Sequence, residues 1–401
     1  MQEANYQSLP LNDEQQQVFE AIDRLAKTES RGKVRMLVTA AGGCGKTFLI
    51  KYLYMHYYGK VTILTPTNKA KQIFELDNIP AKTIHQFLGC GVDYDAETGE
   101  QRYKLFMPND IENELIIVDE CSMLGKDVIH RINGLDAHIL YTGDNRQLPP
   151  VGEDKSDIFS MVDNKFRLTK NMRLSSPDDS YKYLERFRRG DAIQLSKTNC
   201  NTEYEYFKDP ENSVIELAWR NMTCVYRNAE IRRNIFTDAT QIFQKGERLI
   251  FTGRRDTPKR KYRTSDIIYI TDVSITERTI TDGEDRRHTL LFYLLTDADG
   301  TEWLKPHESV YEEFDRIIRK WEKFCAKKKQ KVLWKMFSNF KDTFDPNLQY
   351  AYCMTVHKAQ GSEYDVVFVN ISDIVECKDS CLRTRLLYTA VSRMKKSVFF
   401  I

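Results

Sequence analysis

The sequence lacks a strong net charge of either sign and any long hydrophobic run. Its 60 lysines and arginines are almost matched by 58 aspartates and glutamates, which leaves a net charge of +2. This balance gives no whole-molecule argument for nucleic-acid binding, so such a surface would have to come from local patches. No apolar run reaches bilayer length, and the first residues lack the charged-then-apolar order of a signal peptide. We therefore expect no membrane partner and an intracellular, cytoplasmic location.

Paired cysteines and residues that favour disorder are also scarce. The nine cysteines include no C-x-x-C pair, so we expect free thiols in a reducing compartment and neither disulfides nor zinc ligands. With only 11 prolines and 41% hydrophobic residues, the composition is that of a folded globular protein. A chain of 401 residues exceeds one ordinary core, which predicts two to four domains.

The first part of the chain repeats one pattern, a short apolar run followed by a polar loop. The runs are VRMLVT (34–39), VTILT (61–65), LIIVD (115–119) and HILYT (138–142), with helix-like stretches between them. Continuous apolar strands that alternate with helices predict an α/β fold whose parallel sheet is covered on both faces. Ligands bind such sheets at the carboxyl ends of the strands, and each motif described next begins at one of those ends.

Two stretches interrupt this pattern. Residues 92–94 and 102–106 flank the turn-rich DAETGE, which predicts an inserted β-hairpin. From residue 246, short strands such as ERLIFTG and TLLFYLLTD predict a small antiparallel barrel. Residues 309–337 have apolar side chains near a 3.6-residue period, which predicts one helical segment before the α/β pattern returns in YDVVFVNI and SVFFI.

The first motif, AAGGCGKT, follows the first apolar run and is close to the phosphate-loop pattern G-x-x-x-x-G-K-[ST]. Ala40 stands where the pattern has its first glycine. In such a loop, backbone N–H groups and a helix N-terminus converge on an anion. Lys46 would reach the β- and γ-phosphates, and Thr47 would hold Mg²⁺. The alternative is an ordinary glycine-rich turn. The residues expected to cradle the phosphates are Gly42, Gly43, Cys44, Gly45, Lys46 and Thr47.

Two further motifs follow apolar runs. LIIVDECSML brings Asp119 and Glu120 to a strand end, which suits a metal-bound water ligand and a general base. The alternative is an acidic pair that caps the next helix. GDNRQLPPVG (143–152) places Gln147 before two prolines, which suits an amide held rigidly to sense a γ-phosphate. A stiffened loop alone would leave Asp144 and Gln147 unexplained.

Taken in order, nine segments resemble the motifs of a superfamily 1 helicase. LNDEQ (11–15) resembles the adenine-reading motif, with Gln15 in the place of its glutamine. The other segments are AAGGCGKT (motif I), LTPTNKA (64–70, Ia), TIHQF (83–87, Ib), VDECSM (II), GDNRQLPP (III), LTKNMR (168–173, IV), TVHKAQGSEYD (355–365, V) and LLYTAVSRMKK (386–396, VI). TIHQF, QLPPVG and HKAQGSEYD together resemble the type B branch, the RecD and Dda-like helicases that move 5′→3′ on single-stranded DNA.

The resemblance implies a domain organisation. Residues 1–88 and 111–173 would form a first RecA-like, ATP-binding domain, and residues 174–245 and 345–401 a second RecA-like domain. Residues 89–110 would be the inserted hairpin, the candidate wedge that separates the duplex. Residues 246–344 would form an SH3-like β-barrel with a helical extension.

The resemblance also implies roles in ATP hydrolysis. Arg173 and Arg393 would enter the cleft and stabilise charge on the transferred phosphoryl group, although single arginines in such contexts are more often surface ion-pair partners. Gly361 would contact the γ-phosphate and Glu363 the ribose. The catalytic set would be Lys46, Glu120, Gln147, Arg173 and Arg393, with ATP and Mg²⁺ as cofactors and Thr47 and Asp119 as metal ligands.

A translocase also needs polar contacts to phosphates and platforms on which bases stack. The basic stretch at residues 254–263 is expected to bind single-stranded DNA, whereas residues 327–331 are expected to be a solvated helix end. The hairpin turn DAETGE has no aromatic residue and its negative charge suits DNA poorly, so Tyr94 and Tyr103 are the wedge candidates. The resemblance implies DNA contacts from Thr65, Pro66, Thr67, Lys69, Thr83, His85, Phe87, Thr355, His357 and Lys358. A structural role for the two histidines and a core position for Phe87 are the alternatives.

These implications describe an ATP-dependent DNA helicase or translocase that moves 5′→3′ and unwinds duplex DNA. An RNA helicase of the same superfamily, or a DNA-stimulated ATPase without unwinding activity, is the alternative. The expected partners are single-stranded DNA, junctions of single- and double-stranded DNA, and replication or recombination proteins, with the chain acting as a monomer in DNA replication or repair. The location would be nuclear in a eukaryote, and a phage or viral origin is compatible with the sequence.

Overall fold

The computed structural model describes residues 10–27, 33–89, 91–104, 114–150, 152–153, 155–172, 180–191, 197–198, 200–209, 212–236, 238, 241–257 and 259–401. Nothing is stated about the structure of the other residues. Within the described part of the chain, no helix combines the length and the apolar character needed to cross a membrane. Seven of the cysteines in this part of the chain, all but Cys200, are free thiols.

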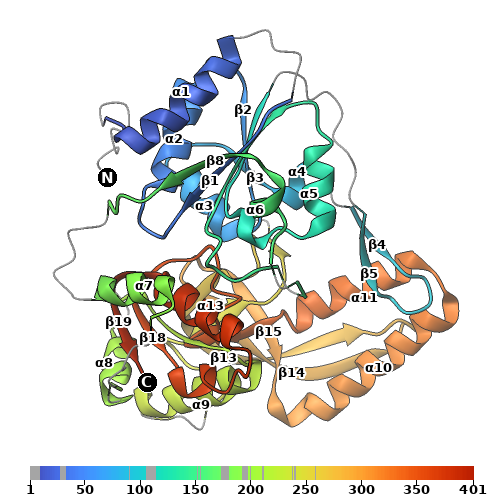
Figure 1. Cartoon of the computed structure of the whole chain (residues 1–401). Helices are drawn as coiled ribbons and strands as arrows, with labels where there is room; N and C mark the ends of the chain where they lie inside the picture. Colours follow the sequence, from blue (N-terminus) through green and yellow to red (C-terminus); the bar gives the residue numbers. More distant parts are fainter. Residues whose placement is uncertain are drawn as a thin grey trace.

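Six parallel strands form the first sheet, as the apolar runs predicted (Figure 1). In spatial order they are β3 (Ala81–Thr83), β2 (Val61–Thr65), β6 (Leu115–Val118), β7 (His138–Gly143), β1 (Arg35–Ala40) and β8 (Asn164–Leu168). Two separate apolar cores pack on this sheet, because the consecutive residues Leu37 and Val38 of one strand belong to different cores. The associated helices are α1 (Asp13–Lys27), α2 (Lys46–His56), α3 (Asn68–Glu75), α4 (Ile84–Phe87), α5 (Lys126–Asn133) and α6 (Ile158–Met161), with a 3-10 turn at Cys121–Met123.

A second parallel sheet lies below the first in Figure 1. Its order is β17 (Cys353–Thr355), β9 (Val214–Ala218), β18 (Tyr364–Val369) and β19 (Met394–Phe400). Its helices are α7 (Ser180–Arg189), α8 (Cys200–Lys208), α9 (Asn221–Ile235), α12 (Ile371–Ile374) and α13 (Ser380–Val391). Leu148 of the first α/β unit packs into the core of the second, so the two units share an apolar contact.

The segment predicted to be a barrel forms an antiparallel sheet of open order β15-β14-β13-β10-β16, with a separate pair β11-β12. The long strands β13 and β14 extend outward and pack against two helices through Ile280, Leu290 and Phe292 (Figure 1). The segment predicted to be helical over 309–337 is helical, but the chain turns at Lys329 with φ 51 and forms two helices. The bounds are β10 (Arg248–Phe251), β11 (Arg255–Asp256), β12 (Lys261–Tyr262), β13 (Ile267–Thr281), β14 (Arg287–Asp297), β15 (Glu302–Pro306), a 3-10 turn (Glu308–Val310), α10 (Tyr311–Lys328), α11 (Lys331–Phe344) and β16 (Leu348–Tyr350).

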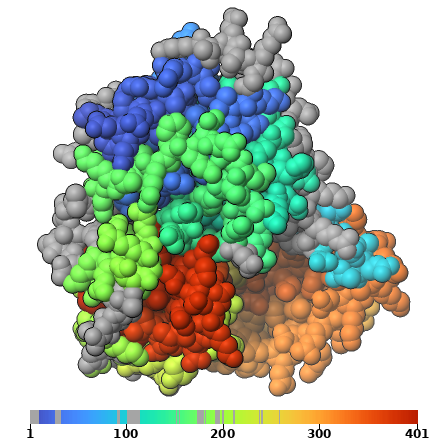
Figure 2. All heavy atoms as spheres, in the orientation of Figure 1, coloured from blue at the N-terminus to red at the C-terminus, as the bar shows by residue number. Residues whose placement is uncertain are grey.

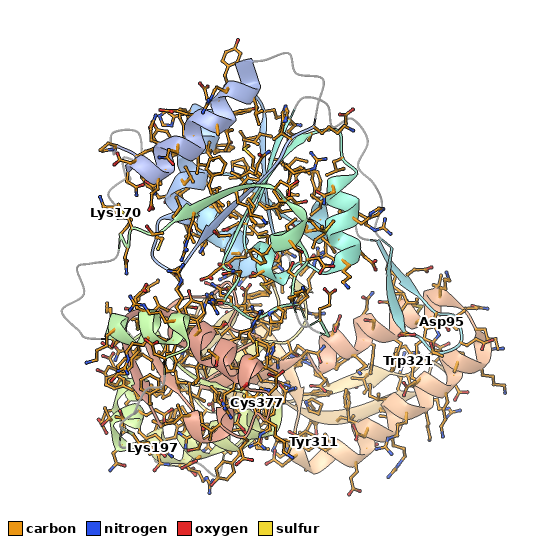
Figure 3. The ribbon with its side chains drawn as sticks, in the orientation of Figure 1. Asp95, Lys170, Lys197, Tyr311, Trp321 and Cys377 are labelled. Atoms are coloured by element: carbon orange, nitrogen blue, oxygen red, sulfur yellow. The ribbon has the colours of Figure 1, made fainter. Side chains whose placement is uncertain are left out.

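The predicted hairpin is present and its tip lies on this helical pair. Strands β4 (Gly91–Tyr94) and β5 (Gln101–Lys104) pair antiparallel, and in Figure 2 the hairpin rests on the helical segment. The Trp334 indole N–H donates to the Ala96 carbonyl at 3.1 Å, and Lys331 pairs with Asp93 at 2.7 Å. Figure 3 shows Asp95, at the turn, beside the helices that carry Trp321. The acidic turn therefore contacts another part of the protein.

Candidate nucleotide cleft and nucleic-acid groove

The AAGGCGKT loop connects β1 to α2 with the geometry of a phosphate loop. Gly43 and Gly45 have φ of 85° and 79°, a region that favours glycine because it has no Cβ. The Lys46 Nζ donates to the carbonyl oxygens of Ala40 at 3.1 Å and Ala41 at 3.4 Å. Ala40 is buried at the strand end and its φ is not positive, so its methyl group needs no unusual backbone. The substitution at the first position of the motif is therefore structurally compatible with the loop.

Gln15 and Met172 flank this loop. Gln15 is fully buried, exchanges two hydrogen bonds with Asn12, and donates from Nε2 to the Gly45 carbonyl at 3.3 Å. A Cβ at Gly45 would lie 2.6 Å from that Nε2, which shows how closely the two segments approach. The Met172 N–H donates to the Gly43 carbonyl at 2.9 Å. The predicted adenine motif and motif IV thus meet at the phosphate loop, but Arg173 itself lies outside the described residues.

Asp119 and Glu120 lie at the end of β6 in different environments. The Asp119 Oδ1 accepts hydrogen bonds from the Thr142 hydroxyl at 2.6 Å and from the Glu120 N–H at 2.8 Å. Glu120 has a left-handed backbone (φ 50, ψ 44), and its buried Oε2 has no hydrogen-bond partner among the described residues. Burial raises the pKa of Glu120; Lys46 opposes this effect and Asp119 adds to it. A glutamate with a strained backbone, a raised pKa and a carboxylate oxygen that has no partner among the described residues suits a general base.

The motif III loop joins the first α/β unit to α13 of the second. The Asp144 carboxylate, 2% exposed, accepts a short hydrogen bond from the Tyr388 hydroxyl. The Leu148 N–H donates to the Thr389 hydroxyl at 3.1 Å, and Arg385 donates to the Gln147 carbonyl at 3.3 Å. Gln147 itself is buried. A change in the motif III loop would therefore be transmitted directly to α13.

Arg393 follows α13 and is buried at the same interface. Its guanidinium donates to the Ser392 hydroxyl at 2.9 Å and to the Ser362 carbonyl at 3.4 Å. A Cβ at Gly42 would lie 3.7 Å from the Ser392 Cβ, so this end of α13 touches the phosphate loop. The charge of Arg393 is among those that oppose the rise in the pKa of Glu120. The structure thus brings motifs I, II, III and VI together at one cleft.

The motif V residues predicted for the nucleotide flank Ser362, whose carbonyl accepts from Arg393, and they also approach motif Ia. Gly361 (φ 77) lies against motif Ia, and a Cβ there would be 2.6 Å from the Thr67 hydroxyl and 3.5 Å from Ala70. Glu363 is half-buried. Their predicted contacts to the γ-phosphate and the ribose stay predictions, and this placement links motif V to the predicted DNA track.

The predicted DNA contacts lie on the loops of both sheets, with unequal exposure. Thr65 is buried and donates to the Thr67 carbonyl at 2.9 Å, whereas His85 and Lys358 are exposed. Phe87 packs against a core of the first unit, which matches its structural alternative. Burial lowers the pKa of His357, so this side chain is neutral at neutral pH.

Three of the predicted DNA-contact residues have intramolecular partners. Thr83 caps α4 by accepting from the Gln86 N–H at 3.2 Å, and the Thr355 hydroxyl accepts from the Lys358 N–H at 3.4 Å. Lys69 pairs with Asp266 at 3.3 Å.

A groove of about 1320 Å³ runs from these loops to the hairpin. Its walls come from motif Ia (Pro66), motif Ib (His85), the β10–β12 segment (Arg255) and α11 (Trp334). The basic stretch 254–263 is partly neutralised, since Arg260 pairs with Asp299 at 2.7 Å and Arg263 lies 3.6 Å from Asp256. Polar loops, basic side chains and aromatic rings thus surround a space continuous with the predicted DNA track.

Comparisons with known proteins agree with this arrangement. An AAA domain model matches residues 23–153, and a UvrD-like helicase C-terminal domain model matches residues 350–401. The Pif1 helicase of Candida albicans has the same fold, with a TM-score of 0.53 and 15% identity over 98% of this chain and 94% of that one. Bacteroides Pif1 in complex with ADP-AlF3 and ssDNA gives 0.52 and 15% over 98% and 92%. The family models thus match parts of both α/β units, and the two Pif1 structures share the fold of this chain.

Two relatives of this chain are described only as uncharacterized proteins. A protein of Acanthamoeba polyphaga mimivirus is 22% identical over 92% of this chain and 95% of its own length. A protein of Methanocaldococcus jannaschii is 23% identical over 91% of this chain, which spans only 36% of that relative.

The side chains at the cleft fit a nucleotide with a divalent cation. The unpartnered Oε2 of Glu120 and the two glycines with positive φ leave polar groups directed at a ligand. Thr47 and Asp119 are the residues available to hold Mg²⁺ beside phosphate oxygens. Among the described residues no group of three histidine, cysteine or acidic side chains could hold a metal ion.

The hairpin contacts correct one expectation and reveal residues that the sequence analysis did not single out. Residues 327–331 are not only a solvated helix end, because Lys329 pairs with Glu97 at 2.7 Å and Lys331 with Asp93. Tyr94 is packed beside the core of this helical pair. Tyr103 lies in β5, and its wedge role stays a prediction. Trp334 and Tyr388 were missed; Tyr388 could have been found, because it lies inside motif VI on the helix that leads to Arg393.

Proposed function

We propose that this chain is an ATP-dependent DNA helicase that moves 5′→3′ on single-stranded DNA and unwinds duplex DNA. The observation that carries the proposal is the convergence of motifs I, II and III with α13 and Arg393 at one cleft, beside a groove lined by motifs Ia and Ib. The two Pif1 structures cited above, one of them bound to ssDNA, support the choice of DNA.

In this proposal the side chains of the cleft divide the work of hydrolysis. Glu120 accepts a proton from the attacking water, and burial raises the pKa of its carboxylate, which makes it a stronger base. Lys46, Gln147 and Arg393, with Arg173, bind and stabilise the γ-phosphate. Mg²⁺, held by Thr47 and Asp119, would supply charge stabilisation on the phosphate oxygens. Gln15 positions the adenine, because its amide is already fixed at Gly45.

The DNA strand in this proposal follows the motif Ia, Ib and V loops into the 1320 Å³ groove. The contact of Gly361 with Thr67 makes motifs V and Ia neighbours, so both α/β units can hold the same strand. Opening and closing of the cleft would alternate these grips and advance the strand.

Direction of movement has a direct test. We expect the purified protein to unwind a duplex with a 5′ single-stranded tail and to leave the same duplex with a 3′ tail intact, in the presence of ATP. Unwinding only from the 3′ tail would overturn the type B assignment. Hydrolysis without unwinding of either substrate would indicate the DNA-stimulated ATPase, and stronger stimulation by poly-U than by poly-dT would indicate the RNA helicase.

The hairpin is proposed as the wedge, held in place by α11. We expect Trp334→Ala to lower the rate of fork unwinding severalfold while DNA-stimulated hydrolysis changes little, because Trp334 contacts the hairpin tip and lies outside the cleft. The measurement compares forked-duplex unwinding with ATP turnover on poly-dT. Met336→Ala, an exposed residue of the same helix outside the lining of the groove, is the matched control. Equal loss of both activities would mean that Trp334 supports the fold and not the wedge.

A further inference from the structure

A second cavity at the cleft, of about 440 Å³, contains four arginines. It borders the phosphate loop only at Thr39 and Ala40, and none of the residues predicted to hold the triphosphate lines it. Its basic residues come from both α/β units. They are Arg146 in the motif III loop, Arg167 on β8, and Arg188 and Arg189 in the last turn of α7.

The charge in this cavity is only partly compensated. Two carboxylates line it, but Asp144 is buried and already accepts from the Tyr388 hydroxyl and the Arg146 backbone N–H. Glu185 lies 3.9 Å from Arg188, a loose pair. Among the described residues, the guanidinium groups of Arg146, Arg167 and Arg189 have no ion-pair or hydrogen-bond partner.

An ordinary explanation covers only half of this cluster. Arginines in the last turn of a helix are favoured by the helix dipole, which accounts for Arg188 and Arg189. Arg146 and Arg167 lie on a loop and a strand of the other α/β unit, where no helix end requires them. Like charges that face each other across two units repel, so closure of the units would be opposed unless an anion lies between them. Four planar guanidinium groups are a set of donors suited to an oxyanion.

We propose that this arginine cavity is an anion site for inorganic phosphate, separate from the phosphate loop. The motif III loop borders both places, since Gln147 is buried toward α13 while the neighbouring Arg146 is exposed into the cavity. Phosphate released at the cleft would have a short path past this loop. A phosphate held there would bridge Arg146 and Arg167 of one unit with Arg188 and Arg189 of the other, and its departure would let the units separate. The identity of the anion as a reaction product rests on the proposed ATP hydrolysis; the site itself does not.

The test is a titration of inorganic phosphate into the full chain without nucleotide or DNA, followed by calorimetry or by broadening of the ³¹P signal. We expect saturable binding that Arg146→Ala/Arg189→Ala weakens by about tenfold or more, because each change removes a charged donor from a different unit. Arg146→Lys/Arg189→Lys should weaken it less. Arg287→Ala, an exposed arginine on β14 far from the cavity, is the matched control and should bind as the unchanged chain does.

Two results would overturn the site. The first is unchanged phosphate binding in the double alanine variant. The second is a loss of phosphate binding in Lys46→Ala while the double alanine variant still binds, because phosphate would then occupy the phosphate loop. If the double variant does not fold, Arg167→Ala on the exposed face of β8 carries the same comparison. If the unchanged chain binds phosphate but hydrolyses no ATP, the proposed function is wrong while the proposed anion site is still supported.

A second measurement, with DNA, tests whether the arginine cavity instead binds a phosphate of the DNA backbone. Binding of a short labelled oligo-dT, followed by fluorescence anisotropy, should be equal in the unchanged chain and the double alanine variant. A severalfold loss of oligo-dT affinity in that variant would assign the arginines to the DNA backbone and overturn the proposal.

Discussion

The two parallel sheets hold buried charge in opposite ways. In the first, Glu120 has a strained backbone and an oxygen without a partner among the described residues, and within the same residues the Lys46 ammonium donates to two carbonyl oxygens. In the second, the Arg227 guanidinium contacts three acidic side chains, those of Glu216 at 2.8 Å, Glu230 at 2.6 Å and Glu203. Buried polar groups are normally satisfied because an unpaired one costs stability. The Glu203 Oε1 also has no partner among the described residues, but its other oxygen accepts from Arg227, so this group is part of a network within the fold.

Asp373 strengthens the contrast within the second sheet. Its carboxylate accepts from the backbone N–H groups of Trp219 at 2.7 Å and Arg220 at 2.9 Å, and from the Thr223 hydroxyl at 2.6 Å. These bonds fix the loop after β9 at the same edge of the sheet where motif V begins. In the second unit the Asp373 carboxylate is thus fully engaged within the fold, whereas the buried Glu120 Oε2 of the first has no partner among the described residues.

The largest expected effect comes from removing the open charges of the first sheet. We expect Lys46→Ala and Glu120→Gln each to lower DNA-stimulated ATP hydrolysis by at least about a hundredfold, since one loses the phosphate contact and the other the base. For the unchanged protein, the raised pKa of Glu120 places the acidic limb of the activity profile above the usual glutamate range. Turnover of either variant near that of the unchanged enzyme would show that the reactive groups lie elsewhere.

A smaller effect, on the stability of the protein, is expected from the charges paired with Arg227. Burial and the neighbouring Glu216 raise the pKa of Glu203 to about 9, against the opposing charge of Arg227. Glu203 therefore keeps its proton in the folded state while the unfolded chain releases it near pH 4.3, so stability is lost as pH rises from about 4.3 toward about 9.

Glu203→Gln, which is neutral at every pH, should remove this loss. We expect the variant to be more stable than the unchanged protein by about 1–3 kcal/mol at pH 8, with little gain at pH 4.5, in urea unfolding. Glu205→Gln, on the exposed face of the same helix, is the control. Parallel pH profiles for the Glu203 variant and the unchanged protein would contradict the assignment.

The smallest effect is expected at the start of the phosphate loop. Ala40→Gly should change ATP affinity by less than about twofold, because the φ of Ala40 already suits an alanine. Gly45→Ala should instead abolish ATP binding, since its φ is positive and its Cβ would meet Gln15 at 2.6 Å. A large gain in affinity for Ala40→Gly, measured with a fluorescent ATP analogue, would show that the methyl group strains the loop.

Much of the architecture was predictable because its signals are local. Each apolar run in the first unit became a strand within a residue or two, and the polar loops after these strands met at one edge, as parallel topology requires. Motif order then placed Lys46, Glu120 and Arg393 at one cleft. The domain boundaries and the roles of single residues stay predictions, since no ligand contact tests them.

The contacts that escaped prediction join segments far apart in the chain. The acidic turn DAETGE looked unsuitable for DNA, and nothing nearby in the sequence indicated that Lys331 and Trp334, 238 residues beyond their hairpin partners, would bind it. Likewise, a glycine at 361 indicates backbone freedom but not that the backbone will press against Thr67. Such pairings depend on how whole units dock, which local patterns do not record.

The docked hairpin has a mechanical consequence. In the proposed wedge role, the hairpin tip would pass the force from a DNA fork through Trp334 and Lys331 into α11 and the long β13–β14 ribbon. That load would be carried by the half of the molecule opposite the nucleotide loop. A hinge motion between the halves would then move the hairpin with the half on which it is docked, so each cycle of the proposed motor would push the wedge as well as pull the strand.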